Sequence, residues 1–485
     1  MVQWRQGGDA AMTKRLPAEP APGPLEDYAQ SFDDLFATLA QRQTFRRYLK
    51  GLLLPAERNK TLTALANTEP VVGAQRKEAQ GLQWFLSESS WGLEELNRRR
   101  VDLMLEDPKT APKDSGVLVI DETGDRKDGK ATAHVGKQYL GGIGKIDNGV
   151  VSVSSLYADE SIYYPVEVEP YTPAHHFEGA KSDPAFRTKP QIALELVERA
   201  VEMKIPFRAV VGDILYGEHR KLKEGFEDGR IPYVLALKPS HTWWHRAGEE
   251  EVGWVEGVAL SAHWGGPEDP GEWVELERRF RDGHTEVWWA LEAECAPYGP
   301  EKTSRLVVAT TDPASLPHLT SWYLTTNLPA PGSKRAEHSE LDAADLAEVV
   351  RLYSLRSWIE QSYKQVKNSL GWAHYQVRKD IAIRRHWQLV MCAFTFCWWA
   401  CMDSREVGLP PVVVFKRDET LPPALSEEAG RGKKEGQAVS CSGGAAVVAY
   451  GVEEGEELVG AVRAACALLE GVLRSAPAQG ATEAA

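Results

Sequence analysis

Two short runs of β-branched and aliphatic residues each stop at an aspartate. The run "GVLVID" ends at Asp121, and the run "RAVVGD" ends at Asp213. Apolar runs of this length are typical of buried strands. A carboxylate at a sheet edge is costly there unless a cation or hydrogen-bond donors stabilise its charge. We therefore expect each strand to position its aspartate; for either aspartate alone, the alternative is a turn or a helix cap.

The segments around these aspartates predict a mixed α/β core. Alternating or continuous apolar runs predict strands, and apolar residues at three- and four-residue steps predict helices. The predicted strands are 116–121, 137–146, 150–158, 208–213, 231–238, 305–311 and 321–327, and the predicted helices include 189–204 and one long helix at 343–370. The expected fold class is α/β, with a mixed sheet flanked by helices.

Length and composition divide the chain further. At 485 residues it exceeds one core of usual size, so about two to four domains are expected. The predicted divisions are a disordered N-terminus at 1–24, a helical domain at 25–110, the core at 111–239 and 305–402, a β-rich insertion at 240–304 and a flexible tail at 403–485. Short apolar runs separated by turns such as "GGPEDPG" predict antiparallel strands in the insertion.

The predicted helix at 343–370 carries a polar stripe along one edge of its apolar face. At 100° per residue, Tyr353, Arg356, Glu360 and Lys367 fall within about 60° of one another. Leucine, isoleucine and valine occupy the neighbouring face, which is the pattern of a helix packed on a sheet. The alternative is a solvated face with an ordinary Arg356–Glu360 pair worth a few tenths of a kcal/mol.

Three acidic side chains from separated segments suggest a metal site. Asp121, Asp213 and Glu360 supply oxygen ligands, which hard ions such as Mg²⁺ and Mn²⁺ prefer. Two such ions about 3.5–4 Å apart can activate water and stabilise the leaving oxygen in phosphodiester cleavage. This combination favours a metal-dependent site over three unrelated turn residues.

The charge distribution leaves room for a nucleic-acid partner. The net charge of −14 and the pI near 5.5 oppose DNA binding when taken as sums, because basic residues supply most non-specific affinity. However, 351–385 contains eight basic and two acidic residues, whereas 240–304 contains 14 acidic and five basic ones. A basic segment therefore remains beside an acidic one.

Other features exclude several classes of protein. The six cysteines form no CxxC pair, which argues against disulfides and a zinc site. The most apolar stretch, 386–402, is shorter than the roughly 20 residues of a membrane span, so we expect a buried helix there and no membrane partner. The N-terminus has no apolar signal segment, and a cytoplasmic protein is expected.

The residues collected so far resemble a known family. The order Asp121, Asp213, Glu360 is similar to that of the DDE transposases, which have an RNase H-like core. The string from Tyr353 to Lys367, Tyr-x2-Arg-x3-Glu-x6-Lys, matches the Y-R-E-K signature of cut-and-paste insertion-sequence transposases. The stretch "VIDETGDRKDGKATAHVGKQYLGGIGKIDNGVVSVSSLYAD" is also similar to the block around the first aspartate of bacterial transposases in this branch. The resemblance covers 32–402.

This resemblance implies a catalytic site. Asp121, Asp213 and Glu360 would bind two divalent ions, Mg²⁺ or Mn²⁺, and the enzyme would cleave DNA and transfer strands at the ends of an insertion sequence. Tyr353, Arg356 and Lys367 would hold the phosphates near the scissile bond. Arginine suits this role through its planar fork and lysine through its mobile charge.

The resemblance also implies partners. These are double-stranded DNA at the transposon terminal repeats, target DNA and a second copy of the chain in a homodimeric complex, which would associate with the nucleoid in the cytoplasm. The candidates for terminal-repeat recognition are basic residues of the helical domain, namely Arg42, Arg46, Arg47, Lys50, Arg98, Arg99 and Arg100. In relatives the insertion helps hold a flipped base, so Trp288 and Trp289 are candidate stacking residues; the alternative is that they form the insertion's own core. His134 could approach the site or be an ordinary loop residue.

Two other functions fit the same residues. One is a domesticated DNA-binding regulator that keeps the fold, and the other is an RNase H-like structure-specific nuclease that cuts without rejoining. Strand transfer, cleavage alone or binding alone on a transposon-end duplex would distinguish the three.

Overall fold

The structure is a computed structural model of the chain. It describes residues 16–21, 24–54, 58–245, 252–279, 285–296, 304–316 and 321–406. Most of the segment predicted as a disordered N-terminus, and the predicted tail beyond Glu406, lie outside the described residues.

Five strands form the central mixed sheet, in the order β4-β3-β1-β5-β6. They are β1 (Val117–Arg126), β3 (Lys145–Ala158), β4 (Tyr163–Tyr171), β5 (Ala209–Gly212) and β6 (Tyr233–Ala236). Strand β3 is antiparallel to β1 and β4, whereas β5 and β6 continue parallel to β1. This order and these directions confirm the expected RNase H-like mixed sheet.

The strands differ from the sequence prediction in three places. The strand with Asp121 continues to Arg126, because the ladder with β3 runs on from Asp121↔Ser154 to Arg126↔Gly149 and holds the polar residues extended. The predicted strand 137–146 is a hairpin of β2 (Gly136–Leu140) and the start of β3, joined by a 3₁₀ turn, η3 (Gly141–Ile143). Strand β4 was missed because Pro165 and Pro170 break its pattern; proline is tolerated at such an edge strand.

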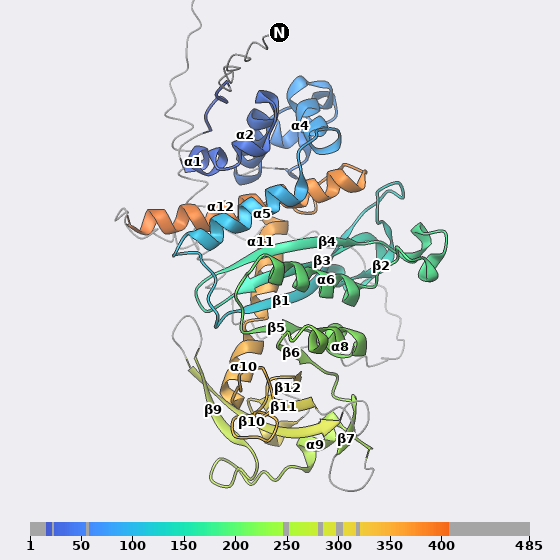
Figure 1. Cartoon of the computed structure of the whole chain (residues 1–485). Coiled ribbons are helices and arrows are strands. Elements are labelled where there is room, and N and C mark those ends of the chain that lie inside the picture. Colours follow the sequence, from blue (N-terminus) through green and yellow to red (C-terminus); the bar gives the residue numbers. More distant parts are fainter. Residues whose placement is uncertain are drawn as a thin grey trace, which may run out of the picture.

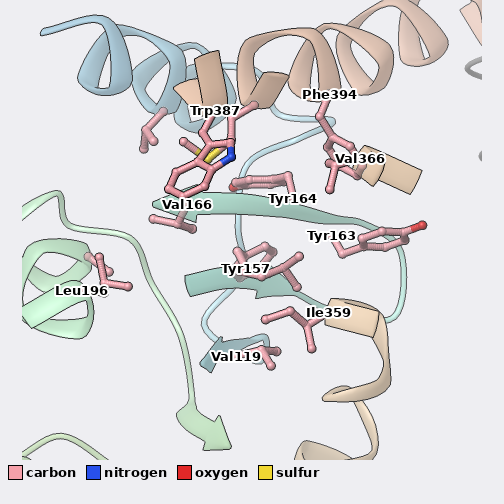
Figure 2. Packing of buried hydrophobic residues seen from close by; sticks show 14 of the residues in the cluster. Val119, Tyr157, Tyr163, Tyr164, Val166, Leu196, Ile359, Val366, Trp387 and Phe394 are labelled. Atoms are coloured by element: carbon pink, nitrogen blue, oxygen red, sulfur yellow. The ribbon is translucent and has the colours of Figure 1, made fainter. Parts of the chain in front are cut away.

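Helices α6 (Lys189–Glu202), α11 (Ser357–Asn368) and α12 (Asp380–Glu406) pack on this sheet. A capping box between Thr188 and Gln191 begins α6, and its buried leucine, isoleucine and valine side chains meet β1, β3 and β4. Figure 2 shows the resulting core, with Trp387 and Phe394 of α12 above Tyr164 and Tyr163. Two shorter helices, α7 (Ile214–Gly217) and α8 (Arg220–Asp228), fill the connection from β5 to β6.

The prediction of a single helix at 343–370 is wrong. The segment forms two helices, α10 (Leu346–Ser354) and α11, separated by Leu355 and Arg356. Backbone hydrogen bonds at the junction span three residues, including Arg356 N–H to Tyr353 O at 3.0 Å and Ile359 N–H to Arg356 O at 3.2 Å. The Oγ atoms of Ser354 and Ser357 donate to carbonyls three residues earlier. Such serine contacts compete with the regular backbone ladder and favour a tighter turn.

The N-terminal helices pack around α12: most lie on its far side from the sheet, whereas the last one runs alongside it and contacts β4 (Figure 1). They are α1 (Pro24–Gln30), α2 (Leu39–Leu53), α3 (Leu62–Leu65), α4 (Lys77–Ser87) and α5 (Leu93–Glu106). Helix α12 contacts α2, α4, α5 and β4, and this cover on several sides explains its apolar sequence. In the part of the chain that the structure describes, no helix is both long and apolar enough to cross a membrane.

A β-rich module extends the sheet beyond β6 (Figure 1). It contains β7 (Thr242–His245), β8 (Val252–Trp254), α9 (Val255–Ser261), β9 (Val274–Arg279), β10 (Thr285–Ala296), β11 (Ser304–Thr310) and β12 (Ser321–Thr326). Neighbouring strands in the module are antiparallel, and β12 pairs antiparallel with β6. Strands β11 and β12, which we had placed in the core, thus form one continuous ladder with β10.

Candidate active site

Strand pairing places Asp121 and Asp213 next to each other. In the parallel ladder between β1 and β5, Ile120 is opposite Gly212, so the next residue of each strand is an aspartate at the same level. Asp213 also caps α7, accepting the Leu215 N–H at 2.9 Å. Asp213 therefore caps a helix, as the alternative interpretation proposed, and it also lies next to Asp121.

Arg356 connects this pair to Glu360. Its Nη1 lies 3.3 Å from Oδ2 of Asp121, and its Nη2 lies 2.7 Å from Oε1 of Glu360. Burial acts to lower the pKa of Arg356, but nearby Tyr353, Asp121, Glu360 and Asp213 raise it above its ordinary value. The guanidinium is therefore the positive centre around which the three acidic side chains gather.

The two aspartates are held in an environment that disfavours their charge. Burial raises the pKa of Asp121 to about 8, and the charges of Asp213 and Glu122 add to the shift while Arg356 opposes it. Burial and Glu122 likewise raise the pKa of Asp213. Excess negative charge in a buried site is a frequent property of catalytic centres.

Glu122 is a fourth carboxylate that the sequence analysis did not select. Its Oε1 accepts a hydrogen bond from Lys189 Nζ, and its Oε2 accepts one from the Tyr216 hydroxyl, each at 2.9 Å. The only sequence feature that could have indicated Glu122 is its position directly after Asp121. Because successive strand residues point to opposite faces of a sheet, this position alone does not predict a place in the same site. Lys189 of α6 and Tyr216 of α7 thus hold Glu122 in place, and its charge raises the pKa of both aspartates.

The donor chemistry of the site suits a hard cation, since Asp121, Asp213 and Glu360 all offer carboxylate oxygens. The geometry is not that of a closed ligand set: among the residues that the structure describes, no three His, Cys, Asp or Glu side chains are grouped as metal ligands. Arg356 lies between Asp121 and Glu360 and offsets their charge.

Tyr353 and Lys367 have internal contacts in this structure. The ring of Tyr353 is buried and packs against Trp322, with centroids 5.0 Å apart. Lys367 Nζ lies 2.7 Å from Oδ1 of Asp125, a buried residue further along β1, and donates to the Gly124 carbonyl at 3.1 Å. The predicted polar stripe is therefore divided between two places. Arg356 and Glu360 lie near Asp121, whereas Lys367 contacts Asp125.

The other candidate residues lie in structural networks. His134 contacts Thr172 through Nδ1 at 2.7 Å and Asp380 through Nε2 at 2.6 Å, tying its loop to the start of α12. Trp288 is buried against Trp322 at 4.5 Å, and Trp289 is buried against Trp264 at 4.7 Å. These contacts favour the alternative interpretations, a loop histidine and a tryptophan core for the module.

Several basic residues expected to recognise DNA are buried inside the N-terminal helices. Arg46 pairs with Glu26 and Asp33, and Arg100 donates to the carbonyls of Pro165 and Val166. The buried members are Arg42, Arg46 and Arg100. Arg47 is exposed and Lys50 is half-buried. Sequence could not distinguish these groups, because both occur on the same amphipathic helices.

Comparison with known proteins gives consistent matches. The family model described as "DDE superfamily endonuclease" matches residues 32–281, and the one described as "Transposase DDE domain" matches 181–396. A curated relative from Microchaete diplosiphon, named "Probable transposase for insertion sequence element IS701", is 29% identical over 367 residues, which cover 76% of this chain and 85% of the relative. Asp121 and Asp213 lie within the first match, and Asp213 and Glu360 lie within the second.

Proposed function

The chain belongs to the DDE superfamily of endonucleases and transposases, and we propose that Asp121, Asp213 and Glu360 are its catalytic carboxylates. It is a DDE-type transposase that acts on DNA with divalent metal ions. Beyond family membership, we propose which residues are catalytic, which metal ions they bind and that the DNA substrate is the ends of an insertion sequence.

The observation that carries the proposal is the convergence of three acidic side chains on Arg356. Asp121 and Asp213 follow paired residues of β1 and β5, and Glu360 comes from the first turn of α11. Arg356 contacts Asp121 and Glu360 directly, and the charge of Asp213 acts on Asp121. A solvated helix face would not connect Glu360, through Arg356, to a strand aspartate.

Asp121, Asp213 and Glu360 would hold two ions, Mg²⁺ or Mn²⁺. When bound, such ions supply an activated water and a stabilised leaving oxygen for phosphodiester cleavage. Asp121 and Asp213 are held by the backbone of adjacent strands, so their spacing is fixed before DNA arrives. Glu360 is half-exposed and completes the set from the helix. Arg356, with Tyr353 and Lys367, would orient the phosphates beside the scissile bond through charge-assisted hydrogen bonds.

The DNA partners would be the terminal repeats of an insertion sequence and a target duplex, and two copies of the chain would form the active complex. Within the N-terminal helices, Arg47 and Arg98 are the exposed candidates for terminal-repeat contact. The acidic β-rich module would meet DNA only locally, because its net negative charge repels phosphate.

The test is metal-dependent processing of a labelled transposon-end duplex by Asp121→Asn, Asp213→Asn and Glu360→Gln. Each variant should lose cleavage and strand transfer in Mg²⁺ and in Mn²⁺ while binding the duplex as the wild type does, because basic residues elsewhere hold most of the phosphates. The matched control is Asp128→Asn, an aspartate two residues beyond the end of β1 whose side chain is 90% exposed; it should cleave normally. Wild-type activity in any of the three variants would refute the assignment. Cleavage without joining by the wild type would instead indicate a nuclease, and binding without cleavage a regulator.

A further inference from the structure

The hairpin between β2 and β3 exposes apolar side chains at its tip, residues 137–146. Tyr139 and Ile146 are direct cross-strand partners, and their exposed fractions are 62% and 69%. Ile143 in the turn between them is 45% exposed. In Figure 1 the hairpin lies at the right-hand end of the sheet, beside the label β2. Contiguous exposed apolar side chains typically mark a contact surface.

The glycines of the tip have no explanation inside the chain. A Cβ added to Gly141 or Gly142 would meet nothing within 4 Å, and neither residue has a positive φ. Only Gly144, with a φ of 65°, has a conformational reason to be glycine. Glycine that is required neither by packing nor by conformation fits a place where another molecule approaches the backbone closely.

The charge around the tip favours a phosphate-bearing partner. Residues 126–147 contain five Lys or Arg and two Asp, in a chain whose net charge is −14. Arg126 and Lys145 share Asp147 at 3.6 Å each. Lys137 and Lys130 are exposed and form no ion pair with the described residues. A protein partner would need acidic groups here, whereas DNA supplies phosphates for the lysines and sugars or bases for Tyr139 and Ile143.

The hairpin is built on the strands of the candidate active site. Asp121 is opposite Ser154 of β3, and Ile146 lies on that same strand, eight positions earlier. At about 3.3 Å per residue, the tip is roughly 26 Å from the aspartate along the strand. A duplex following this direction advances about 3.4 Å per base pair and would meet the tip roughly eight base pairs from the cleaved bond.

We propose that the tip of the β2–β3 hairpin binds double-stranded DNA about eight base pairs from the scissile phosphate. The inference rests on the proposed function, since it uses the position of the cleaved bond. Lys137 contacts a phosphate, the glycines allow the backbone of the turn to approach the DNA, and Tyr139 with Ile146 packs on sugars or bases. The tip thereby fixes the direction in which the duplex leaves the site.

A photo-crosslinking amino acid at position 143 tests the contact in the full chain. On a duplex extending about 15 base pairs on both sides of the cleavage site, it should crosslink to nucleotides near the eighth base pair from the cleaved bond. The matched position is 260 on α9, where Leu260 is 58% exposed in the acidic module; it should give no DNA crosslink. Crosslinks from position 143 that join two protein chains and spare DNA would overturn the proposal in favour of a protein interface.

Substitution of the turn glycine gives a second measurement. Gly142→Leu has room for its side chain, so its melting temperature should match the wild type. We expect about tenfold weaker binding of the long duplex, the size typical of losing one close aromatic or backbone contact, and unchanged binding of a duplex trimmed to five base pairs on each side. Gly257→Leu on α9, where an added Cβ would meet only Trp254 Cβ at 4.0 Å, is the matched control. Equal binding of the long duplex by Gly142→Leu and wild type would refute the inference, whereas failure of the wild type to cleave either duplex would refute the proposed function instead.

Discussion

The guanidinium of Arg356 lies 3.3 Å from the carboxylate of Asp121, although 235 positions separate the two residues in the chain. The contact joins the start of α11 to the middle of β1. It exists because two serine-assisted turns shift Arg356 out of a continuous helix. The helix junction thus places a cation beside a buried strand carboxylate.

Replacement of this cation should impair catalysis. We expect Arg356→Ala to lower cleavage of a transposon-end duplex by at least about 100-fold, the usual effect of removing one charge stabiliser from an active site. Arg351→Ala is the matched control, because Arg351 is a half-buried arginine of α10 that pairs with Glu160. It should cleave like the wild type. Single-turnover cleavage rates in Mn²⁺ would check both, and equal rates for Arg356→Ala and Arg351→Ala would contradict the role.

The sequence was sufficient to predict those strands, and the carboxylates that follow them, whose patterns lie within a few neighbouring residues. The apolar runs before Asp121 and Asp213 predicted β1 and β5, and the polar stripe predicted the Arg356–Glu360 pair that lies beside Asp121. The extension of β1 past Asp121 was not predictable, because residues 121–126 are polar and are held extended only by the long ladder with β3. Strand β4 was hidden for the opposite reason, since its two prolines interrupt the pattern of a strand that forms one edge of the core.

Side-chain environments were the least predictable level. Arg46 and Arg47 are neighbours on α2, yet one is buried between two acids and the other faces solvent. Lys367 was predicted from its spacing to Glu360, but the strand residue beside it is Asp125. Both outcomes depend on the packing of segments that are distant in sequence, and the periodicity of one helix does not predict that packing.

Lys367→Ala should destabilise the fold, contrary to the expectation from a purely phosphate-binding role. The substitution leaves the buried carboxylate of Asp125 without the ammonium 2.7 Å away, which costs about 2 kcal/mol when solvent partly screens the pair. The double variant Asp125→Ala, Lys367→Ala should regain most of this loss. Urea unfolding of the single and double variants measures it. If the single variant is as stable as the wild type, the ion pair contributes nothing to the fold.

Arg46 and Arg47 should separate stability from DNA binding in the N-terminal helices. Arg46→Ala removes the buried guanidinium that pairs with Glu26 and Asp33, so the free energy of unfolding should fall by about 3 kcal/mol. Arg47→Ala should leave stability unchanged and, if Arg47 contacts a phosphate, reduce the slope of log binding constant against log salt by about one unit. Thermal melts and a salt series of end-duplex binding check the pair. An unchanged salt slope in Arg47→Ala would exclude it as a phosphate contact.

His386 should make the fold sensitive to mild acid. Its Nδ1 accepts from the Tyr48 hydroxyl at 2.8 Å and its Nε2–H donates to the Gly371 carbonyl at 3.1 Å, which joins α12 to α2. Burial lowers the pKa of His386 to about 4, below the ordinary value near 6.5. The folded chain therefore favours the neutral ring, so its stability is complete above about pH 6.5 and falls as the pH drops toward 4.

Protonation of His386 should lower the free energy of unfolding by about 3 kcal/mol as the pH approaches 4. His386→Gln should be less stable than the wild type at pH 7.5, because it disturbs the contacts with Tyr48 and Gly371, but its stability should fall less between pH 6.5 and 5. His263→Gln is the control: His263 is exposed and its pKa is raised by its hydrogen bond with Asp269, so its removal should leave the acid loss in place. Urea unfolding across this pH range measures all three proteins. Parallel stability curves for wild type and His386→Gln would show that acid sensitivity arises elsewhere.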